Sequence, residues 1–313
     1  MHFEEILMEK EPVIRVIGVG GAGGTAINNM KKMGIGEMTT IAVDTDKEAL
    51  DDIRCDFKIL MKKHGSDKEL KTGRKVVMES EGMIKNSLGK ADIVFVVAGM
   101  GGQTGAISPL ISRIPREIGA LIVAIVTMPF SFEGEICLER AKNGLSELKG
   151  TSGCIFPIFN DRLCKFYNPD DALTEIFEKN NEFMCRIVRS ISGLLHENGL
   201  ISIDFADVKS IIKKSGFSKF GTGMGRGVDK ARNAAMEAIN CPMFENFSLK
   251  EAGIVLVNIM TGKDSDIAEV AEAMQVIYEN AGGDQDISYA HVFDKNMEDE
   301  IRVNLILAGF HEF

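Results

Sequence analysis

The chain has 313 residues, of which 45% are hydrophobic and 26% are charged, as in ordinary soluble globular proteins. A formal net charge of −10 argues against a nucleic acid partner held by a basic surface, although a nucleotide held by backbone amides remains compatible with it. The chain shows no run of about 20 apolar residues and no signal-peptide core, so we expect a cytoplasmic protein of two domains.

The first predicted element is a strand over Val13–Ile17, which leads into a glycine-rich stretch, Gly18–Gly24, and then a helix from Thr25 to Met33. This order of strand, glycine loop and helix favours a phosphate group bound by loop amides and by the positive end of the helix. Tight packing of the helix on the strand, without any ligand, is the alternative explanation.

A second strand is predicted over Thr39–Val43, and the acidic residues Asp44 and Asp46 follow it. In dinucleotide-binding folds an acidic residue about 20 residues after the glycines holds a ribose hydroxyl. This pattern keeps a Rossmann-type NAD-dependent oxidoreductase open as an alternative. The same carboxylates are also typical caps for a helix that starts at Lys47.

A second glycine-rich loop distinguishes this chain from a simple dinucleotide-binding protein. An edge strand over Phe57–Met61 and an amphipathic helix over Gly73–Leu88 precede it, and the apolar strand Ile93–Val97 leads into it. The loop itself, Ala98–Gly105, contains four glycines, so backbone N–H groups can approach an anion closely. Its glutamine and threonine add side chains that reach phosphate oxygens.

The elements that follow continue the alternation of strands and helices. This pattern, with continuous apolar strands, is typical of a parallel sheet covered by helices on both faces. Polar residues follow the carboxyl ends of the strands, where such sheets bind ligands. The predicted strands span residues 120–126 and 154–158, and the predicted helices span residues 107–118 and 135–149.

A long helical stretch, residues 171–195, is expected to connect this sheet to a second domain. After it, Asp204 and Asp207 lie three residues apart, which places both on one face of a first helical turn. From spacing alone, capping of that helix is the default explanation. The remaining sequence predicts a smaller α+β domain. Its predicted helices span residues 208–215 and 228–239, and its predicted strands span residues 253–260, 286–293 and 301–308. The last strand shows the alternation of apolar and polar residues that is typical of a half-buried strand.

Six cysteines are scattered along the chain without a CxxC pair. This spacing argues against a zinc site and against a disulfide framework. We therefore expect buried thiols and no metal site built by the protein. The six residues are Cys55, Cys137, Cys154, Cys164, Cys185 and Cys241.

With these residues laid out, the chain resembles the FtsZ proteins, the tubulin-like cell-division GTPases, along nearly its whole length. The resemblance implies an α/β fold with a parallel-sheet GTP-binding domain, a long central core helix and a smaller α+β C-terminal domain with a mixed sheet. The expected boundaries are residues 1–170, 171–207 and 208–313. Six motifs match in content and order: Gly18–Gly24, Asp44–Asp46, Ala98–Gly105, Pro129–Gly134, Asn160–Leu163 and Asp204–Val208.

The resemblance also implies where GTP or GDP would bind. The glycine-rich loops would contact the phosphates and Glu133 the ribose hydroxyls. Asn160 and Asn181 would bond guanine, because an asparagine amide both donates and accepts, and Phe177 would stack on the base. The residues implied to contact the nucleotide are Gly20, Gly21, Ala22, Gly23, Asp44, Gly99, Gly101, Gly102, Gln103, Thr104, Gly105, Glu133, Asn160, Phe177 and Asn181.

Hydrolysis in the family takes place between subunits, and the resemblance assigns Asp204 and Asp207 as catalytic residues acting on the nucleotide of the adjacent subunit. They would orient water near a Mg²⁺-bound γ-phosphate. Such a head-to-tail contact generates a filament. We therefore expect GTP or GDP and Mg²⁺ as cofactors, self-association as the main partnership, no nucleic acid partner, and a role in cell division or cell shape.

Four places depart from the family pattern. Ser202 stands where the family has asparagine, Gln103 replaces a glycine, Lys63–Lys68 replaces a glycine- and alanine-rich loop, and Glu135–Cys137 replaces basic residues. These changes motivate the second hypothesis, a slow or non-hydrolysing scaffold or regulator that co-assembles with another FtsZ. The tail that recruits membrane-anchoring partners is missing from the sequence, so we expect no direct membrane anchor.

Overall fold

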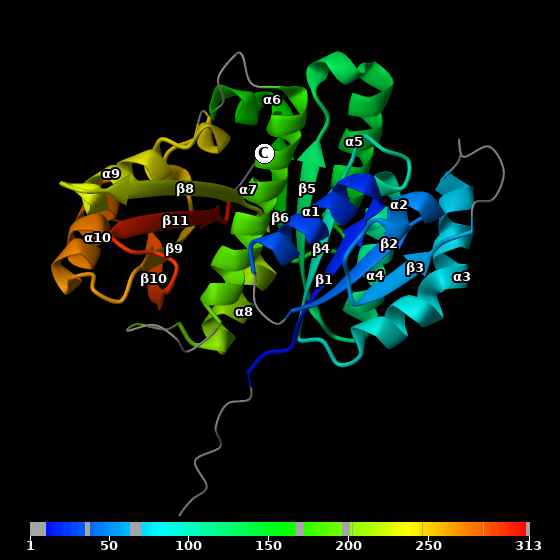
Figure 1. Ribbon diagram of the computed structural model, residues 1–313, viewed down its shortest axis with the longest axis horizontal. Coiled ribbons are helices and arrows are strands. Elements are labelled where there is room, and N and C mark those ends of the chain that lie inside the picture. The colour runs from blue at the N-terminus through cyan, green and yellow to red at the C-terminus, as the bar shows by residue number, and fades with distance from the viewer. Residues whose placement is uncertain are drawn as a thin grey trace, which may run out of the picture.

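The computed structural model describes residues 11–34, 38–62, 70–166, 172–195, 201, 203–245, 247–283 and 285–310. Within these ranges the chain forms two sheets, and a long helix, α7 (Leu173–Gly193), lies between them (Figure 1). No helix of the described ranges is both long enough and apolar enough to cross a bilayer. The predicted fold class, a parallel α/β sheet followed by a smaller domain with a mixed sheet, is confirmed.

Sheet A, the larger sheet, has seven parallel strands in the order β3-β2-β1-β4-β5-β6-β7. Most of its strands are continuous apolar runs because helices cover both of its faces. The predicted edge strand is confirmed at β3. The strands are β1 (Ile14–Val19), β2 (Thr39–Asp44), β3 (Phe57–Leu60), β4 (Ile93–Gly99), β5 (Leu121–Met128), β6 (Cys154–Phe159) and β7 (Gly216–Phe217).

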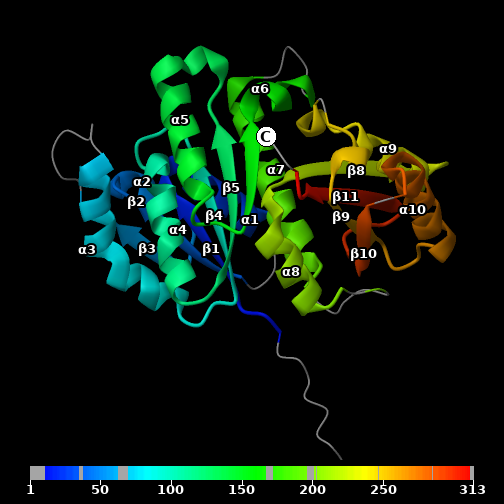
Figure 2. The same cartoon turned by 180° about the vertical axis from the view of Figure 1, so that it is seen from behind.

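Alternate side chains of β4 enter two different cores, because successive residues of a strand point to opposite faces. Phe95 packs in the core that includes α1 and α7, whereas Val94 and Val96 pack in the core that includes α3, α4 and α5. Figures 1 and 2 show these two sets of helices on opposite faces of sheet A. The helices are α1 (Gly20–Lys32), α2 (Lys47–Asp51), α3 (Leu70–Leu88), α4 (Ser108–Glu117), α5 (Glu135–Leu148) and α6 (Asn160–Leu163).

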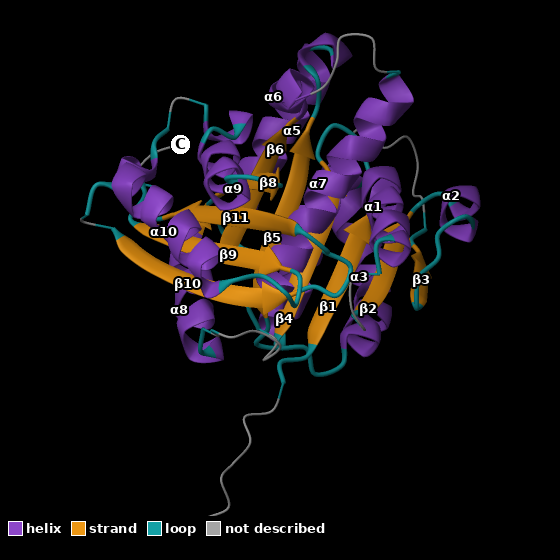
Figure 3. Ribbon diagram, turned by 60° about the vertical axis from the view of Figure 1, so that its left-hand side comes forward, coloured by secondary structure: helices purple, strands orange, loops and turns teal. Residues whose placement is uncertain are grey.

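Sheet B, the smaller sheet, has four strands in the order β10-β9-β11-β8, with one parallel and two antiparallel pairings. Helices α9 and α10 lie along this sheet (Figure 3). After α7 the chain adds α8, which contacts strands of sheet A. The elements are α8 (Phe205–Ser215), β8 (Lys219–Arg226), α9 (Lys230–Ile239), β9 (Ile254–Thr261), α10 (Ile267–Ala281), β10 (Asp286–Phe293) and β11 (Glu300–Ala308).

Helix α7 ties the two sheets into one continuous apolar core. Ile187 and Val188 of this helix belong to the same buried cluster as Phe95 of sheet A and Val257 of sheet B. A buried hydrogen bond also joins α7 to sheet B: Asn258 Nδ2 of β9 donates to the carbonyl oxygen of Ser190 of α7 at 2.7 Å. The sheets are therefore held to α7 by both apolar and hydrogen-bonded contacts.

Two elements of the second domain were not predicted, β8 and α10. Glycines occupy alternate positions of β8, so the strand lacks the β-branched signal that sequence patterns rely on. The reason is the closeness of α9: a Cβ on Gly225 would lie 1.8 Å from the carbonyl oxygen of Lys230, and one on Gly223 would lie 2.1 Å from that of Ala234. The glycines of β8 let the helix backbone pack directly on the strand.

Three other expectations need correction. Helix α1 begins at Gly20, not at Thr25, so the first glycine run forms the opening turns of the helix. Strand β11 does not alternate between buried and exposed residues: it is buried almost throughout, because it pairs on both sides and elements pack on both faces of sheet B. Only three of the six thiols are buried, those of Cys154, Cys185 and Cys241, whereas the other three are half-buried.

Burial makes those three thiols poor nucleophiles. It raises the pKa of the Cys154 and Cys185 thiols to about 12 and that of Cys241 to about 11. A thiol must lose its proton to attack an electrophile or bind a metal. These cysteines therefore behave as small apolar core residues.

Candidate functional site

A pocket of about 340 Å³ lies at the carboxyl ends of four parallel strands, β1, β4, β5 and β6. This is the edge at which an open parallel sheet binds ligands. The structure brings together there most of the residues singled out from the sequence. The pocket is lined by Val19, Gly20, Gly21, Ala22, Gly99, Gly101, Gly102, Gln103, Thr104, Gly105, Thr127, Pro129, Glu133, Asn160 and Phe177.

The first glycine run supplies a helix N-terminus to this pocket. Strand β1 ends at Val19 and α1 starts at Gly20, whose φ of +70° suits glycine. The first turn of α1 holds no acidic residue, so its N–H groups and the helix dipole are available to an anion. Gly23 does not line the pocket: a Cβ there would lie 2.5 Å from the carbonyl oxygen of Val97, so this glycine serves packing.

The loop after β4 forms the second wall, and two of its glycines are needed for its shape. A Cβ on Gly105 would lie 1.8 Å from the carbonyl oxygen of Gly99, and a Cβ on Gly99 would lie 2.9 Å from Cβ of Ala22. The loop therefore folds back on itself and against α1. The Thr104 hydroxyl lies 3.2 Å from that of Thr45, which links the loop to the segment after β2.

Glu133 places a carboxylate beside this loop. Its Oε1 accepts a hydrogen bond from the backbone N–H of Phe130 at 2.8 Å, which fixes the side chain in the turn that follows β5. Its other oxygen, Oε2, would lie 3.5 Å from a Cβ on Gly101. Oε2 thus faces the pocket beside the glycine loop, where it can accept hydrogen bonds from a hydroxyl-bearing ligand.

Asn160 and Phe177 form the remaining wall. Asn160 begins α6 directly after β6 and is only 5% exposed, and its Oδ1 accepts a hydrogen bond from Nδ2 of Asn180 at 3.1 Å. Phe177, near the start of α7, is 44% exposed and packs edge-on against Phe130 with ring centroids 5.7 Å apart. An amide and a partly open aromatic face together suit a planar, hydrogen-bonding base.

Besides Gly23, two of the predicted contact residues, Asp44 and Asn181, lie outside the lining of this pocket. Asp44 is buried, and its Oδ1 accepts hydrogen bonds from the backbone N–H groups of Thr45 and Asp46, so it shapes the turn after β2. The neighbouring Asp46 caps α2 by accepting from the N–H groups of Glu48 and Ala49, as the capping alternative predicted. Asn181 is buried on α7 and does not reach the lining.

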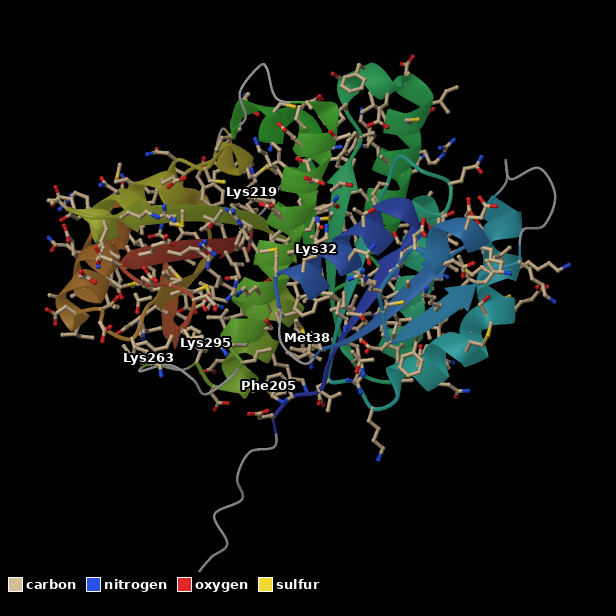
Figure 4. The ribbon with its side chains drawn as sticks, viewed as in Figure 1. Lys32, Met38, Phe205, Lys219, Lys263 and Lys295 are labelled. Atoms are coloured by element: carbon tan, nitrogen blue, oxygen red, sulfur yellow. The ribbon has the colours of Figure 1, made fainter. Side chains whose placement is uncertain are left out.

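The two acidic residues expected to act in catalysis lie far from this pocket in the same subunit. Asp204 caps α8, its Oδ1 accepting from the N–H of Ala206 at 3.0 Å, and Asp207 is exposed in the first turn of that helix. Phe177 lies near the start of α7, whose 21 residues span roughly 30 Å, and α8 follows the other end. In Figure 4 the labelled Phe205, next to Asp204, accordingly lies at the end opposite to that at which β5 and β6 finish.

Sequence reasoning missed four residues at or beside the pocket. Val19 and Pro129 lie within matched motifs and Thr127 follows the predicted strand over residues 120–126, but nothing in their type marks them as lining residues. Arg140 of α5 is the fourth: its Nη1 donates to the carbonyl oxygen of Gly101 at 2.7 Å, across 39 residues of sequence. No sequence signal could have indicated a contact over that separation.

Two of the noted departures cannot be placed. Ser202 and Lys63–Lys68 lie outside the described residues. The described residues also contain no group of three or more His, Cys, Asp or Glu side chains arranged to hold a metal ion. A divalent cation at this pocket would therefore have to bring ligands with it, as Mg²⁺ does when it binds through phosphate oxygens and water.

Two family models match this chain. The model of the tubulin/FtsZ family GTPase domain matches residues 13–168, and the model of the FtsZ family C-terminal domain matches residues 216–311. Over 303 residues the chain is 34% identical to the cell division protein FtsZ of Pseudomonas aeruginosa. That match covers 95% of this chain and 77% of the relative.

Solved structures give the same grouping. An empty FtsZ dimer of M. jannaschii matches with a TM-score of 0.88 at 30% identity, covering 97% of this chain and 90% of the other. A CetZ2 protofilament of Haloferax volcanii with GTPγS bound matches with a TM-score of 0.76 at 18% identity, covering 95% and 92%. The second likeness is one of fold alone.

Proposed function

The chain belongs to the tubulin/FtsZ family, and on that premise we propose that its pocket binds GTP and that a second copy completes the site for hydrolysis. The activity is that of the family's GTPase domain, hydrolysis of GTP to GDP and phosphate, in an FtsZ-like cytoskeletal protein. The oxidoreductase alternative is wrong. It arose because the first glycine run and the acidic Asp44 after the second strand are also features of dinucleotide-binding folds.

The observation that carries this proposal is the separation of the pocket from the acidic residues. Phe177, which lines the pocket, is near the start of α7, whereas Asp204 and Asp207 are at the start of α8, which lies near the other end of α7 (Figure 1 shows the two helices). A subunit cannot bring its own carboxylates to its own pocket without unfolding. A head-to-tail contact supplies them from the next copy, and such a contact repeats into a filament.

Within the pocket we assign each contact by chemistry. The N-terminus of α1 and the loop Gly99–Gly105 would bind the phosphates through backbone N–H groups. Glu133 would accept from the ribose hydroxyls, Asn160 would bond guanine and Phe177 would stack on it. Asp204 and Asp207 of the adjacent copy would orient the attacking water. Three predicted residues outside the lining would support the site indirectly, by shaping the turns and helices that carry the contact residues. They are Gly23, Asp44 and Asn181.

Mg²⁺ fits this site as a companion of the nucleotide. The pocket offers oxygen atoms from Gln103, Thr104 and Glu133, which are the donor type that Mg²⁺ prefers. When bound, the ion would neutralise phosphate charge. The net charge of −10 supports the further proposal that the protein has no nucleic acid partner, and its similarity to FtsZ supports a cytoplasmic location.

The proposal is tested by measuring GTP hydrolysis against protein concentration, with light scattering recorded on the same samples. We expect the rate per subunit to rise at the concentration at which scattering rises, because the site is built between subunits. Assembly with GTP but without phosphate release would support the scaffold hypothesis instead. A rate per subunit that is constant from high dilution upward would contradict an intersubunit site.

Replacing Asn160 with alanine tests how the base is recognised. We expect binding of GTP to weaken by about tenfold to a hundredfold, with loss of preference over ATP, because a buried site built to bond a base discriminates through those bonds. Competition of GTP and ATP for a fluorescent nucleotide measures this. Asn233→Ala is the matched control: it removes an exposed amide side chain from α9, outside the pocket lining, and should leave the preference for GTP unchanged. Equal GTP preference in the Asn160 variant and the unaltered protein would contradict the assignment.

A further inference from the structure

The pocket is poor in positive charge for a ligand that carries several negative charges. Among the residues that the structure describes, its lining contains one carboxylate, that of Glu133, and no lysine or arginine. The dipole of α1 and the backbone N–H groups of the loops provide only partial charges. The first turn of α5, which follows Glu133 in the chain, adds another carboxylate, Glu135. Among the described residues of the protein itself, a full positive charge can therefore reach the pocket from behind the lining, not from the lining.

Arg140 is in the position to supply it. This half-buried residue lies on α5, and its Nη1 donates to the carbonyl oxygen of Gly101, which is itself part of the lining. Helix α5 packs tightly against this loop, because a Cβ on Gly144 would lie only 2.4 Å from Cε of Met100. The guanidinium is thus fixed directly behind the loop that would hold the terminal phosphates.

The chemistry of a guanidinium suits this place. Its planar fork carries five N–H donors around a delocalised positive charge. One donor orients Gly101 and so the backbone of the loop. The charge itself acts on any anion on the other side of the loop, and it acts most strongly on the phosphate that lies nearest.

We propose that Arg140 is a positioning residue that gives this pocket its preference for GTP over GDP, by holding Gly101 and by placing a positive charge behind the γ-phosphate. The inference rests on the proposed function, because it presupposes that the pocket takes a guanine nucleotide. A γ-phosphate adds negative charge at the glycine loop, so removal of Arg140 penalises GTP more than GDP.

Three substitutions in the full chain separate charge from loop support. Arg140→Ala removes both, Arg140→Gln keeps an N–H donor without the charge, and Arg140→Lys keeps the charge. The matched control is Lys142→Ala, which removes a positive charge from an exposed position of the same helix. Dissociation constants are measured for GDP and for a non-hydrolysable GTP analogue, with thermal unfolding to verify the fold of each variant.

We expect the affinity ratio of analogue to GDP to fall about tenfold in Arg140→Ala and Arg140→Gln and by less in Arg140→Lys, with no change in Lys142→Ala. The preference of the unaltered protein should also weaken as salt is raised, because salt screens the charge. If all three Arg140 variants weaken both nucleotides equally, the residue only supports the loop and the proposal is overturned. An unchanged ratio in Arg140→Ala, or an equal shift in Lys142→Ala, also overturns it. If the unaltered protein binds neither nucleotide, it is the proposed function itself that fails.

Discussion

Replacing Asp207 with alanine is expected to abolish GTP turnover, by at least about a hundredfold, while leaving GTP binding unchanged. Asp207 lies exposed in the first turn of α8 and does not line the pocket. The substitution therefore leaves its own subunit's nucleotide site intact. Under the proposed intersubunit mechanism, it removes a carboxylate from the pocket of the next subunit, where water must be oriented. Phosphate release and nucleotide binding are measured on the same preparation.

Asp207 is a cleaner test than Asp204, because Asp204 also caps α8 and its loss costs about 1 kcal/mol of helix stability. Asp207→Asn, which keeps the shape but not the charge, should behave like the alanine variant. The matched control is Asp286→Ala, which removes an exposed carboxylate from the start of β10 and should retain full turnover. Full turnover in Asp207→Ala would refute its catalytic role.

Most of sheet A could be predicted from the sequence because its signals are local. Continuous apolar runs end close to glycine or polar residues, and most of these runs are followed by a helical pattern. The binding edge of the sheet follows from this alternation, because parallel strands must end on the same side. The positions of Gly101, Glu133 and Asn160 at one pocket follow from the order of the strands to which they are attached.

The direction in which individual side chains turn could not be predicted. Asp44 ends β2 at the expected edge, yet its carboxylate bonds the backbone of its own turn. Of the two adjacent asparagines of α7, Asn180 bonds the pocket residue Asn160, whereas Asn181 was the one chosen from the family pattern. Which residue of a helix faces a pocket depends on how the helix packs on its neighbours, and the spacing of residues in the sequence does not determine that packing.

Contacts between distant segments were also hidden. Arg140 contacts Gly101 only because α5 packs against the glycine loop. Likewise, the glycines of β8 suit a strand there because the backbone of α9 packs directly on them. In both cases the sequence shows a local feature, an arginine on a helix or glycines at alternate positions, whose meaning comes from a partner elsewhere in the chain. Such features become interpretable once the fold is known.

Replacing Gly105 with alanine is expected to eliminate nucleotide binding and to lower the free energy of unfolding by about 3 kcal/mol. The added Cβ would lie 1.8 Å from the carbonyl oxygen of Gly99, a backbone atom that cannot move without displacing the end of β4. The loop would have to open, and its N–H groups would no longer point into one site. Thermal or denaturant unfolding and GTP binding measure the two effects separately.

Gly102 offers the matched control within the same loop. A Cβ at this position would meet no atom within 4 Å, so Gly102→Ala should keep the stability of the unaltered protein. Equal stability of the two variants would show that the close approach of Gly105 to Gly99 does not hold the loop.

Mixing two inactive variants tests the intersubunit site directly. A Gly105→Ala subunit retains its acidic residues, and an Asp207→Ala subunit retains its pocket. If hydrolysis occurs between subunits, two inactive preparations should recover part of the normal turnover when combined, whereas a site contained in one subunit would leave the mixture inactive.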